Sequence, residues 1–195
     1  MVLRRKSTQK IPVKHPSRTS PSEKPRFLLT LKETPRWYDA NPFILSHYRP
    51  PSVSTTLCYK SWTYLHNESL NIHSHLLPAL LSIPTQWTLQ SYLGTTYPRA
   101  LWTDRAFLSF HLLTVTICLC VSAHFHTFMN HSPAIARRWL KYDYLGIVTL
   151  ILGDFVSGIY LGFYCERAPR VIYWAMVRPS PFPPQDIQPH RHYKY

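Results

Sequence analysis

The feature that most restricts the fold of this sequence is a set of three long stretches that carry almost no charge. Residues 69–98 and 106–136 contain no Asp, Glu, Lys or Arg, and residues 144–165 contain only Asp154. Each stretch is longer than the ~20 residues that a helix needs to cross the hydrocarbon core of a bilayer. Three such stretches in 195 residues argue against a soluble domain. They predict an all-α integral membrane protein that crosses the bilayer several times.

The three predicted spans differ in strength. The second and third are strongly apolar, whereas the first is interrupted by Pro78, Pro84 and two glutamines. Because proline is tolerated in a spanning helix when neighbouring groups satisfy the backbone, we predict that the first stretch also crosses. A kinked helix lying at the interface is the alternative. The expected fold is three transmembrane helices plus a stub of a fourth, at about residues 73–97, 106–128, 144–165 and 171–177.

The rest of the chain divides into three polar segments. Residues 1–36 are rich in Lys, Arg, Pro and Ser and have too few apolar residues to offset the entropy of ordering, so we expect a basic disordered tail. Residues 37–68 are expected to form a cytoplasmic, amphipathic segment ahead of the membrane. Residues 178–195 form a Pro-rich, charged tail that cannot continue a transmembrane helix. Residues 69–177 remain as the transmembrane domain.

The distribution of basic residues predicts the orientation and the partners. Twelve of the 22 Lys and Arg residues precede the first span, two lie between the first and second spans, and three lie between the second and third. Because Lys and Arg are retained on the cytoplasmic side, we predict a cytoplasmic N-terminus. The net charge of +13 would also suit a nucleic-acid-binding protein, but no zinc-finger, RNP-like or helix-turn-helix pattern accompanies it. We therefore expect membrane lipids as partners, with the tail against anionic lipid, and no nucleic acid.

A polar cluster is predicted near the cytoplasmic ends of the spans. Ser122 and His126 are one helical turn apart and share a face, whereas His124 points elsewhere. Asp143 opens the third span from the same side and should face His126 at matching depth. Ionisable groups at that depth are costly and usually face the interior of a bundle, which makes His126 a candidate metal ligand. The alternative is an ordinary set of polar helix ends, with Asp143 as an N-terminal cap.

A second polar stripe precedes the first span. Glu68, Asn71 and His75 follow i, i+3, i+7 spacing, which places them on one helical face. This face should lie at the same membrane level as His126. We therefore predict that the stripe joins the cluster around His126.

Four sequence motifs carry a resemblance to a known family: NPFILSHYRPP (41–51), LHNESLNIHSHLL (65–77), SAHFHTFMNHS (122–132) and KYDYLGIVTLILGDFVSGIYLGFYC (141–165). In this order they resemble the consecutive motifs of the adiponectin receptor and progestin receptor-like family, also called haemolysin III-related proteins. The resemblance runs from about Pro35 to Val177. It implies a seven-helix bundle with a cytoplasmic N-terminus.

The resemblance also implies a site and an activity. In the family, a zinc ion near the inner leaflet is bound by the His of a Ser-x-x-x-His motif and by two His of a His-x-x-x-His motif in the seventh helix. Carried over to this chain, His126 is implied as a zinc ligand, Asp143 as the residue that orients a water, and Ser122 as a supporting hydroxyl. The implied activity is amide hydrolysis of ceramide-like lipids, for which zinc makes hydroxide available near neutral pH.

The chain departs from the family pattern after residue 177, where no counterpart of helices four to seven follows. The two histidines of the tail are two residues apart in a Pro-rich coil on the opposite side of the membrane. His111 lies about 22 Å from His126 along the same helix, so His75 is the remaining substitute ligand. Since a catalytic zinc site needs about three protein ligands, we expect this chain neither to bind zinc tightly nor to hydrolyse ceramide-like lipids.

Two other interpretations stay open. One is a non-catalytic membrane adaptor that associates with itself or with full-length relatives through Asp154, which has no Lys or Arg in any span to pair with. The other is an incomplete gene model of a seven-helix protein, with residues 178–195 translated from an intron. In the adaptor, the small residues that would help helices to associate are Gly146, Gly153, Ser157 and Gly158.

Overall fold

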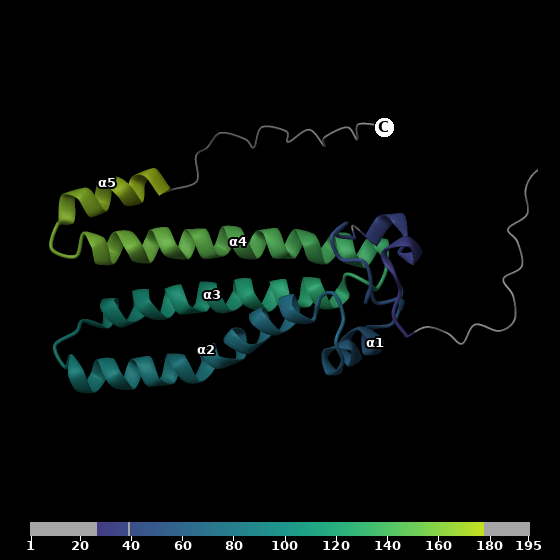
Figure 1. Ribbon diagram of the computed structural model, residues 1–195. Helices are drawn as coiled ribbons and strands as arrows, with labels where there is room; N and C mark the ends of the chain where they lie inside the picture. Colours follow the sequence, from purple (N-terminus) through teal and green to yellow (C-terminus); the bar gives the residue numbers. More distant parts are fainter. Residues whose placement is uncertain (1–26, 39, 178–195) are drawn as a thin grey trace, which may run out of the picture.

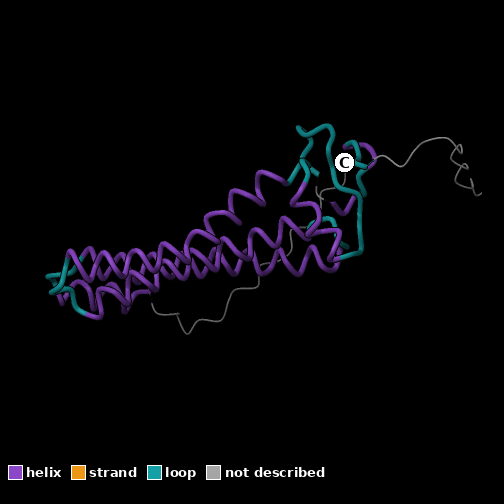
Figure 2. The backbone as a smooth tube through the Cα atoms, turned by 90° about the horizontal axis from the view of Figure 1, so that it is seen from below, coloured by secondary structure: helices purple, strands orange, loops and turns teal. Residues whose placement is uncertain are grey.

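The computed structural model describes residues 27–38 and 40–177, which are helical apart from loops and one isolated antiparallel bridge between Leu29 and Tyr48. Three long helices lie side by side and antiparallel, and a shorter helix folds back along the last of them (Figure 1). Short helices and loops cover one end of this layer (Figure 2). The elements are η1 (Leu31–Glu33), η2 (Arg36–Tyr38), α1 (Thr55–Lys60), η3 (Ser61–Thr63), α2 (Ser69–Thr96), α3 (Trp102–Phe128), α4 (Pro133–Gly162) and α5 (Arg167–Val177).

Helices α3 and α4 approach each other closely because α4 places small residues toward α3. A Cβ atom added to Gly146 would lie 2.5 Å from a side chain of α3, and one added to Gly153 would lie 2.8 Å from Cβ of Thr114. One turn beyond Gly153, Ser157 donates a hydrogen bond to the carbonyl oxygen of Phe107 (3.0 Å). Small residues at helix interfaces allow this kind of backbone approach in membranes.

Helix α2 continues through Pro78 and Pro84 for 28 residues. The glutamines that weaken it as a predicted span bond to α3, because Nε2 of Gln86 and Nε2 of Gln90 donate to Oγ of Ser109 (2.6 and 2.8 Å). Such pairing lowers the cost of placing amides in an apolar stretch. Among the helices of the described segments, α3 and α4 are long and apolar enough to cross a membrane, and α2 falls short of that measure.

At the end where α3 begins, which we call the Asp104 end, a carboxylate joins α3 to α4. Tyr160 donates to one oxygen of Asp104 (2.5 Å) and Tyr164 donates to the other (3.1 Å). The chain then turns into α5, which begins at Arg167 and runs back along α4 (Figure 1). The helix expected at 171–177 therefore exists and starts one turn earlier.

At the opposite end, which we call the Arg49 end, the segment ahead of α2 folds as a cap over the end of α3. The backbone N–H of Ser52 donates to the carbonyl oxygen of Asn130 (3.0 Å), and the indole of Trp62 donates to Oγ1 of Thr127 (2.9 Å). Cys58 is fully buried in this cap. The segment predicted at 37–68 is thus tied to α3 by specific hydrogen bonds.

The predicted disordered tail, residues 1–36, extends too far along the chain, because residues 27–36 make specific hydrogen bonds. Within residues 27–36, the N–H of Leu29 donates to the carbonyl oxygen of Tyr48 (2.7 Å), and the carboxylate of Glu33 accepts from the N–H of Thr30 (2.7 Å). The composition of this stretch did not predict that it is ordered, because the order depends on hydrogen bonds to a segment later in the chain. Residues 1–26 and the predicted Pro-rich tail at 178–195 lie outside the described residues.

Helix α4 differs most from its predicted span. Pro133 occupies its first turn, and the hydroxyl of Ser132 accepts a hydrogen bond from the N–H of Ile135 (3.5 Å), so the helix begins well before residue 144. The charged residues Arg137, Arg138 and Lys141, which were expected to lie in a loop between two spans, belong to the first turns of α4. Asp143 therefore lies inside the helix, and its suggested role as an N-terminal cap is wrong.

Most of the residues proposed for association with other molecules make contacts within the chain instead. Gly146, Gly153 and Ser157 are buried against α3, whereas a Cβ atom added to Gly158 would meet nothing within 4 Å. Asp154 was expected to be unpaired, but one of its carboxylate oxygens lies 3.2 Å from Nδ1 of His111. That expectation was wrong because it considered Lys and Arg as partners and left out histidine.

Candidate functional site

The backbone around His126, in the last turn of α3, is fixed by a buried arginine. Arg49 donates from Nη2 to the carbonyl oxygen of His126 (2.6 Å), and from Nη1 to the carbonyl oxygen of Thr127 (3.0 Å) and to Oγ of Ser61 (2.8 Å). The last carbonyl groups of a helix have no partner within the helix. The guanidinium supplies those partners through charge-assisted hydrogen bonds, and it therefore caps α3 directly beneath His126.

The imidazole of His126 is held by Glu68, the residue just ahead of α2. Nδ1 of His126 lies 2.9 Å from Oε2 of Glu68. The carboxylate also accepts hydrogen bonds from the side-chain amides of Asn71 (2.8 Å) and Asn67 (2.8 Å). A carboxylate on one ring nitrogen fixes the orientation of a histidine and leaves the other nitrogen available to bind a metal. Here the available nitrogen is Nε2.

Glu68 is the charged partner in this pair. Burial acts to raise the pKa of Glu68, but hydrogen bonds from His126 and Asn71 outweigh burial, and the nearby charge of Arg49 adds to them. The pKa of Glu68 therefore lies below its ordinary value. Glu68 is ionised at neutral pH and accepts the Nδ1–H of His126.

His66 lies beside this carboxylate and stays neutral. Its Nδ1 accepts a hydrogen bond from the backbone N–H of Glu68 (3.0 Å). Burial and the nearby positive charge of Arg49 lower the pKa of His66 to about 4. His66 therefore supports the turn before α2 as a neutral acceptor.

The other predicted site residues surround His126 less closely. The ring centroids of His75 and His126 are 5.8 Å apart, and Nδ1 of His75 is buried with no hydrogen-bond partner among the residues that the structure describes. Asp143 is close enough to His75 to interact with it electrostatically, although its carboxylate makes no hydrogen bond in the described part of the chain. Ser122 is buried one turn before His126. The structure thus brings His126 together with Glu68, Asn71 and His75, while Asp143 and Ser122 lie nearby without bonding to it.

The side chains described at this end do not form a complete metal site. Within residues 27–38 and 40–177, no group of three His, Cys, Asp or Glu side chains is placed to hold a metal ion. Nε2 of His126 is available, and His75 is its nearest imidazole neighbour. His124 is turned away and stacks on Trp139 with ring centroids 5.2 Å apart. Because a catalytic zinc site needs about three protein ligands, the described residues do not complete one.

Arg49, like His66 and Asn67, is a residue of this site that the sequence patterns did not single out. It is 0% exposed, and its hydrogen bonds join the cap to α3. One signal was present, since Arg49 is the only charged residue among residues 40–59 and lies inside the motif NPFILSHYRPP. A lone cation in an uncharged segment is rarely buried unless specific acceptors surround it.

The long apolar helices of this chain, with a histidine–carboxylate pair at one end, place it in the class of helical membrane proteins. The family described as haemolysin-III related matches residues 63–179, and the chain belongs to this family of adiponectin and progestin receptor-like membrane proteins. It is 34% identical over 151 residues to progestin and adipoQ receptor-like protein 1 of Caenorhabditis elegans. It is 37% identical over 143 residues to the ADIPOR-like receptor IZH2 of Saccharomyces cerevisiae. It is 36% identical over 150 residues to progestin and adipoQ receptor family member 3 of Homo sapiens.

These matches cover most of this chain and a minor part of each relative. They include 77%, 71% and 75% of this chain, in the order given above. They include 34%, 44% and 47% of the worm, yeast and human proteins. The chain therefore spans less than half the length of the relatives it matches. The resemblance of its motifs to this family is confirmed.

Proposed function

We propose that this chain is a receptor-like, multi-pass membrane protein that crosses the bilayer with α2, α3 and α4 and starts a fourth helix with α5. Helix α2 supports this proposal because it lies beside α3 over a comparable length and exposes large apolar side chains where lipid would lie. The Arg49 end faces the cytoplasm in this proposal, because α4 carries Arg137, Arg138 and Lys141 near that end. The exposed apolar side chains of α2 include Leu77, Leu80, Leu81, Ile83 and Trp87.

The orientation is tested by mapping glycosylation of the full chain in microsomes. We expect a glycan on an acceptor site introduced into the loop at residues 97–101, and none on the native sequon at Asn67. A glycan on Asn67 with none on the introduced site would place the Arg49 end outside the cytoplasm.

We propose further that the Arg49 end carries part of a zinc site of the kind used to hydrolyse ceramide-like lipid amides. The observation that carries this proposal is the 2.9 Å bond from Nδ1 of His126 to Glu68, which leaves Nε2 as a metal ligand. His75, Asp143 and Ser122 add polar atoms at the same level. With these ligands alone, the chain binds zinc weakly and does not hydrolyse ceramide-like lipids.

The test is zinc content and zinc affinity of the purified full chain. We expect less than one zinc per chain after dialysis, no release of fatty acid from ceramide, and a weak affinity that falls in His126→Ala. His124→Ala is the matched control, because His124 stacks on Trp139 and should leave zinc affinity unchanged. Stoichiometric zinc that survives dialysis, is lost in His126→Ala and accompanies ceramide hydrolysis would overturn the inactive assignment. Equal affinities in wild type, His126→Ala and His124→Ala would overturn the zinc role of His126.

A second function, that of a non-catalytic membrane adaptor, is favoured by one separate observation. Asp154 and His111 form a polar pair whose side chains are 55% and 43% exposed within stretches predicted to lie in the membrane. An adaptor needs a surface that binds another helix, and we propose that this exposed pair is part of such a surface. It lies far along α3 from the site around His126, so the two functions are separable by mutation.

A further inference from the structure

A cavity lies at the Asp104 end, where the loop between α2 and α3 meets the turn after α4. Its volume is about 510 Å³, which falls within the roughly 300–1,000 Å³ of typical ligand sites. The cavity combines an anion, a cation, two tyrosine rings and apolar surface. The lining residues that carry the argument are Leu93, Tyr97, Arg99, Asp104 and Tyr164.

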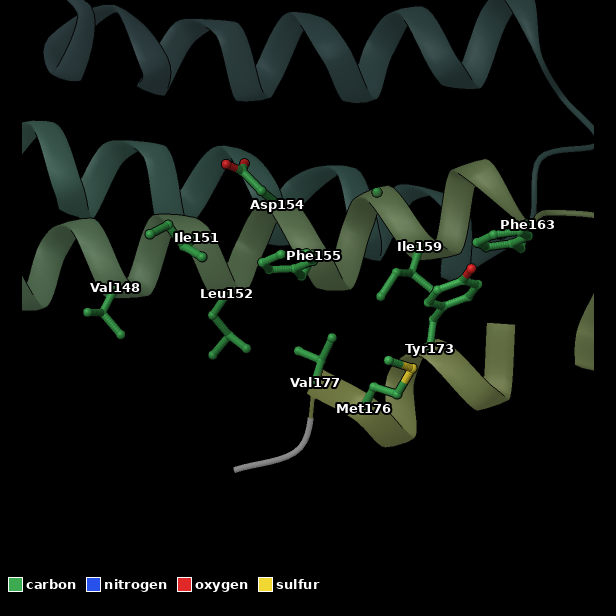
Figure 3. Close-up of a pocket in the computed structure, with 11 residues that line it drawn as sticks. Val148, Ile151, Leu152, Asp154, Phe155, Ile159, Phe163, Tyr173, Met176 and Val177 are labelled. Atoms are coloured by element: carbon green, nitrogen blue, oxygen red, sulfur yellow. The ribbon is translucent and has the colours of Figure 1, made fainter. Parts of the chain in front are cut away.

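The larger groove between α4 and α5 differs from this cavity in charge. Figure 3 shows that groove, of about 820 Å³, with Asp154 projecting away from Met176 and Val177. Among the described residues that line it, none is Lys or Arg. It suits an alkyl chain, whereas the cavity at the Asp104 end presents charges of both signs.

The negative side of the cavity is the carboxylate of Asp104, which already accepts several hydrogen bonds. Tyr160 donates to one oxygen (2.5 Å), and Tyr164 donates to the other (3.1 Å). The second oxygen also accepts from the backbone N–H of Leu101 (2.8 Å). Such bonds favour the charged carboxylate, and they occupy about three of its four lone-pair sites. A cation without N–H groups therefore gains more here than a cation that needs several acceptors.

The tyrosine rings and the arginine supply the other contacts. Tyr97 is 53% exposed and Tyr164 is 47% exposed, so ring surface of both is open to a ligand. Aromatic faces attract a quaternary ammonium group. Arg99 is exposed and makes no hydrogen bond or ion pair within the described part of the chain, so its guanidinium can bind a phosphate with two donors.

The cavity also lies where lipid headgroups would lie. The first predicted span ends at residue 97, the second begins at residue 106, and the third uncharged stretch ends at residue 165. A choline phospholipid carries its quaternary ammonium and its phosphate in this layer, and its acyl chains extend toward apolar side chains such as Leu93. This depth rests on the proposed membrane crossing of α2, α3 and α4.

We propose that the cavity binds the phosphocholine headgroup of a phosphatidylcholine molecule. The quaternary ammonium lies against the rings of Tyr97 and Tyr164, beside the carboxylate of Asp104. The phosphate binds Arg99. Because the ammonium of phosphatidylethanolamine requires acceptors that the carboxylate has already used, the site selects choline over ethanolamine.

The test is competition between the two lipids for the purified full chain in dodecyl maltoside, with bound lipid counted by native mass spectrometry. Both lipids carry the same acyl chains. We expect phosphatidylcholine to bind about threefold more tightly, and this preference to disappear in Tyr97→Leu. Arg99→Gln should weaken both lipids about threefold, because it removes the phosphate contact that they share. Arg167→Gln is the matched control, because Arg167 is exposed at the same end and does not line the cavity.

Tyr164→Phe tests the selectivity at a single oxygen atom. The ring remains, but the hydrogen bond to Asp104 is removed, which leaves a lone pair of the carboxylate available. We expect phosphatidylethanolamine to bind about threefold more tightly in this variant, with the affinity for phosphatidylcholine unchanged. A role of Tyr164 in folding alone would instead lower both affinities.

Soluble phosphocholine separates the headgroup from the lipid. We expect it to displace phosphatidylcholine only at a much higher concentration, and equal affinities would overturn the lipid as the occupant. Equal binding of the two lipids by wild type, or equal effects of Arg99→Gln and Arg167→Gln, would overturn the headgroup site. Circular dichroism verifies that each variant is folded. These outcomes do not alter glycosylation mapping, so failure of this site is distinguishable from failure of the proposed membrane crossing.

Discussion

Arg49 is the residue whose replacement tests the Arg49 end most directly. Its guanidinium is completely buried and donates three hydrogen bonds of 2.6 to 3.0 Å, two of them to the final carbonyl groups of α3. Arg49→Met keeps much of the apolar length of the side chain and removes every donor. The carbonyl oxygens of His126 and Thr127 and the hydroxyl of Ser61 would then lose these donors in a buried place.

The expected cost follows from the number and kind of these bonds. A buried hydrogen bond contributes about 1 kcal/mol net, and more when one partner is charged. Three such bonds total about 3–4 kcal/mol, because each removed donor leaves a neutral acceptor buried without a partner. Arg49→Lys should fall between methionine and wild type, because one ammonium group cannot reproduce the planar fork of the guanidinium.

Cys58 supplies the assay, because its thiol is fully buried in the same cap. Burial also raises the pKa of the Cys58 thiol, so labelling at neutral pH requires the cap to open. With the other three cysteines replaced by serine, the labelling rate of Cys58 in micelles measures this opening. A loss of about 3 kcal/mol should raise the rate by about 100-fold. Arg36→Met is the control, because Arg36 is exposed in the same cap. A change below about threefold in Arg49→Met would refute the capping role.

Two further predictions concern packing and pH. Gly153→Ala should destabilise the chain by about 2 kcal/mol in detergent unfolding, because the new methyl group overlaps Thr114. Gly162→Ala, where a Cβ atom meets nothing within 4 Å, should leave the unfolding free energy unchanged, and equal effects of the two substitutions would contradict the packing argument. Because burial lowers the folded-state pKa of His66 to about 4, the unfolded chain binds more protons between pH 6.5 and pH 4, and stability falls as pH decreases through this window. After allowing for solvent screening, the loss is about 2 kcal/mol, and a thermal midpoint that falls as steeply in His66→Asn would contradict the assignment.

Local patterns in the sequence predicted much of the helical framework. The uncharged stretches identified α3 and α4 as apolar helices, and helical phase placed Ser122 and His126 on one face with His124 elsewhere. The i, i+3, i+7 spacing brought Glu68 and Asn71 to the same side of the turn into α2. These features follow from the 3.6-residue period and from apolar content, which are properties of short stretches of chain.

The same patterns could not predict the hydrogen-bond partners of these residues. The bond between Glu68 and His126 joins residues 58 positions apart, and the bond from Arg49 to Thr127 joins residues 78 positions apart. The start of α4 was placed too late because charged residues preceding Asp143 interrupt the apolar pattern without interrupting the helix. A helix boundary there depends on the cap at Ser132, which hydropathy does not register.

The sequence by itself determined that this chain makes apolar helices long enough for a membrane, which residues share each helical face, and to which family its motifs belong. The tertiary structure decided that Arg49 caps the helix end beneath His126, that Glu68 holds the imidazole of His126, and that Asp154 pairs with His111. The division has a physical reason. Apolar content and helical phase are fixed within one segment, whereas a buried hydrogen bond exists only when two distant segments place donor and acceptor within about 3 Å of each other.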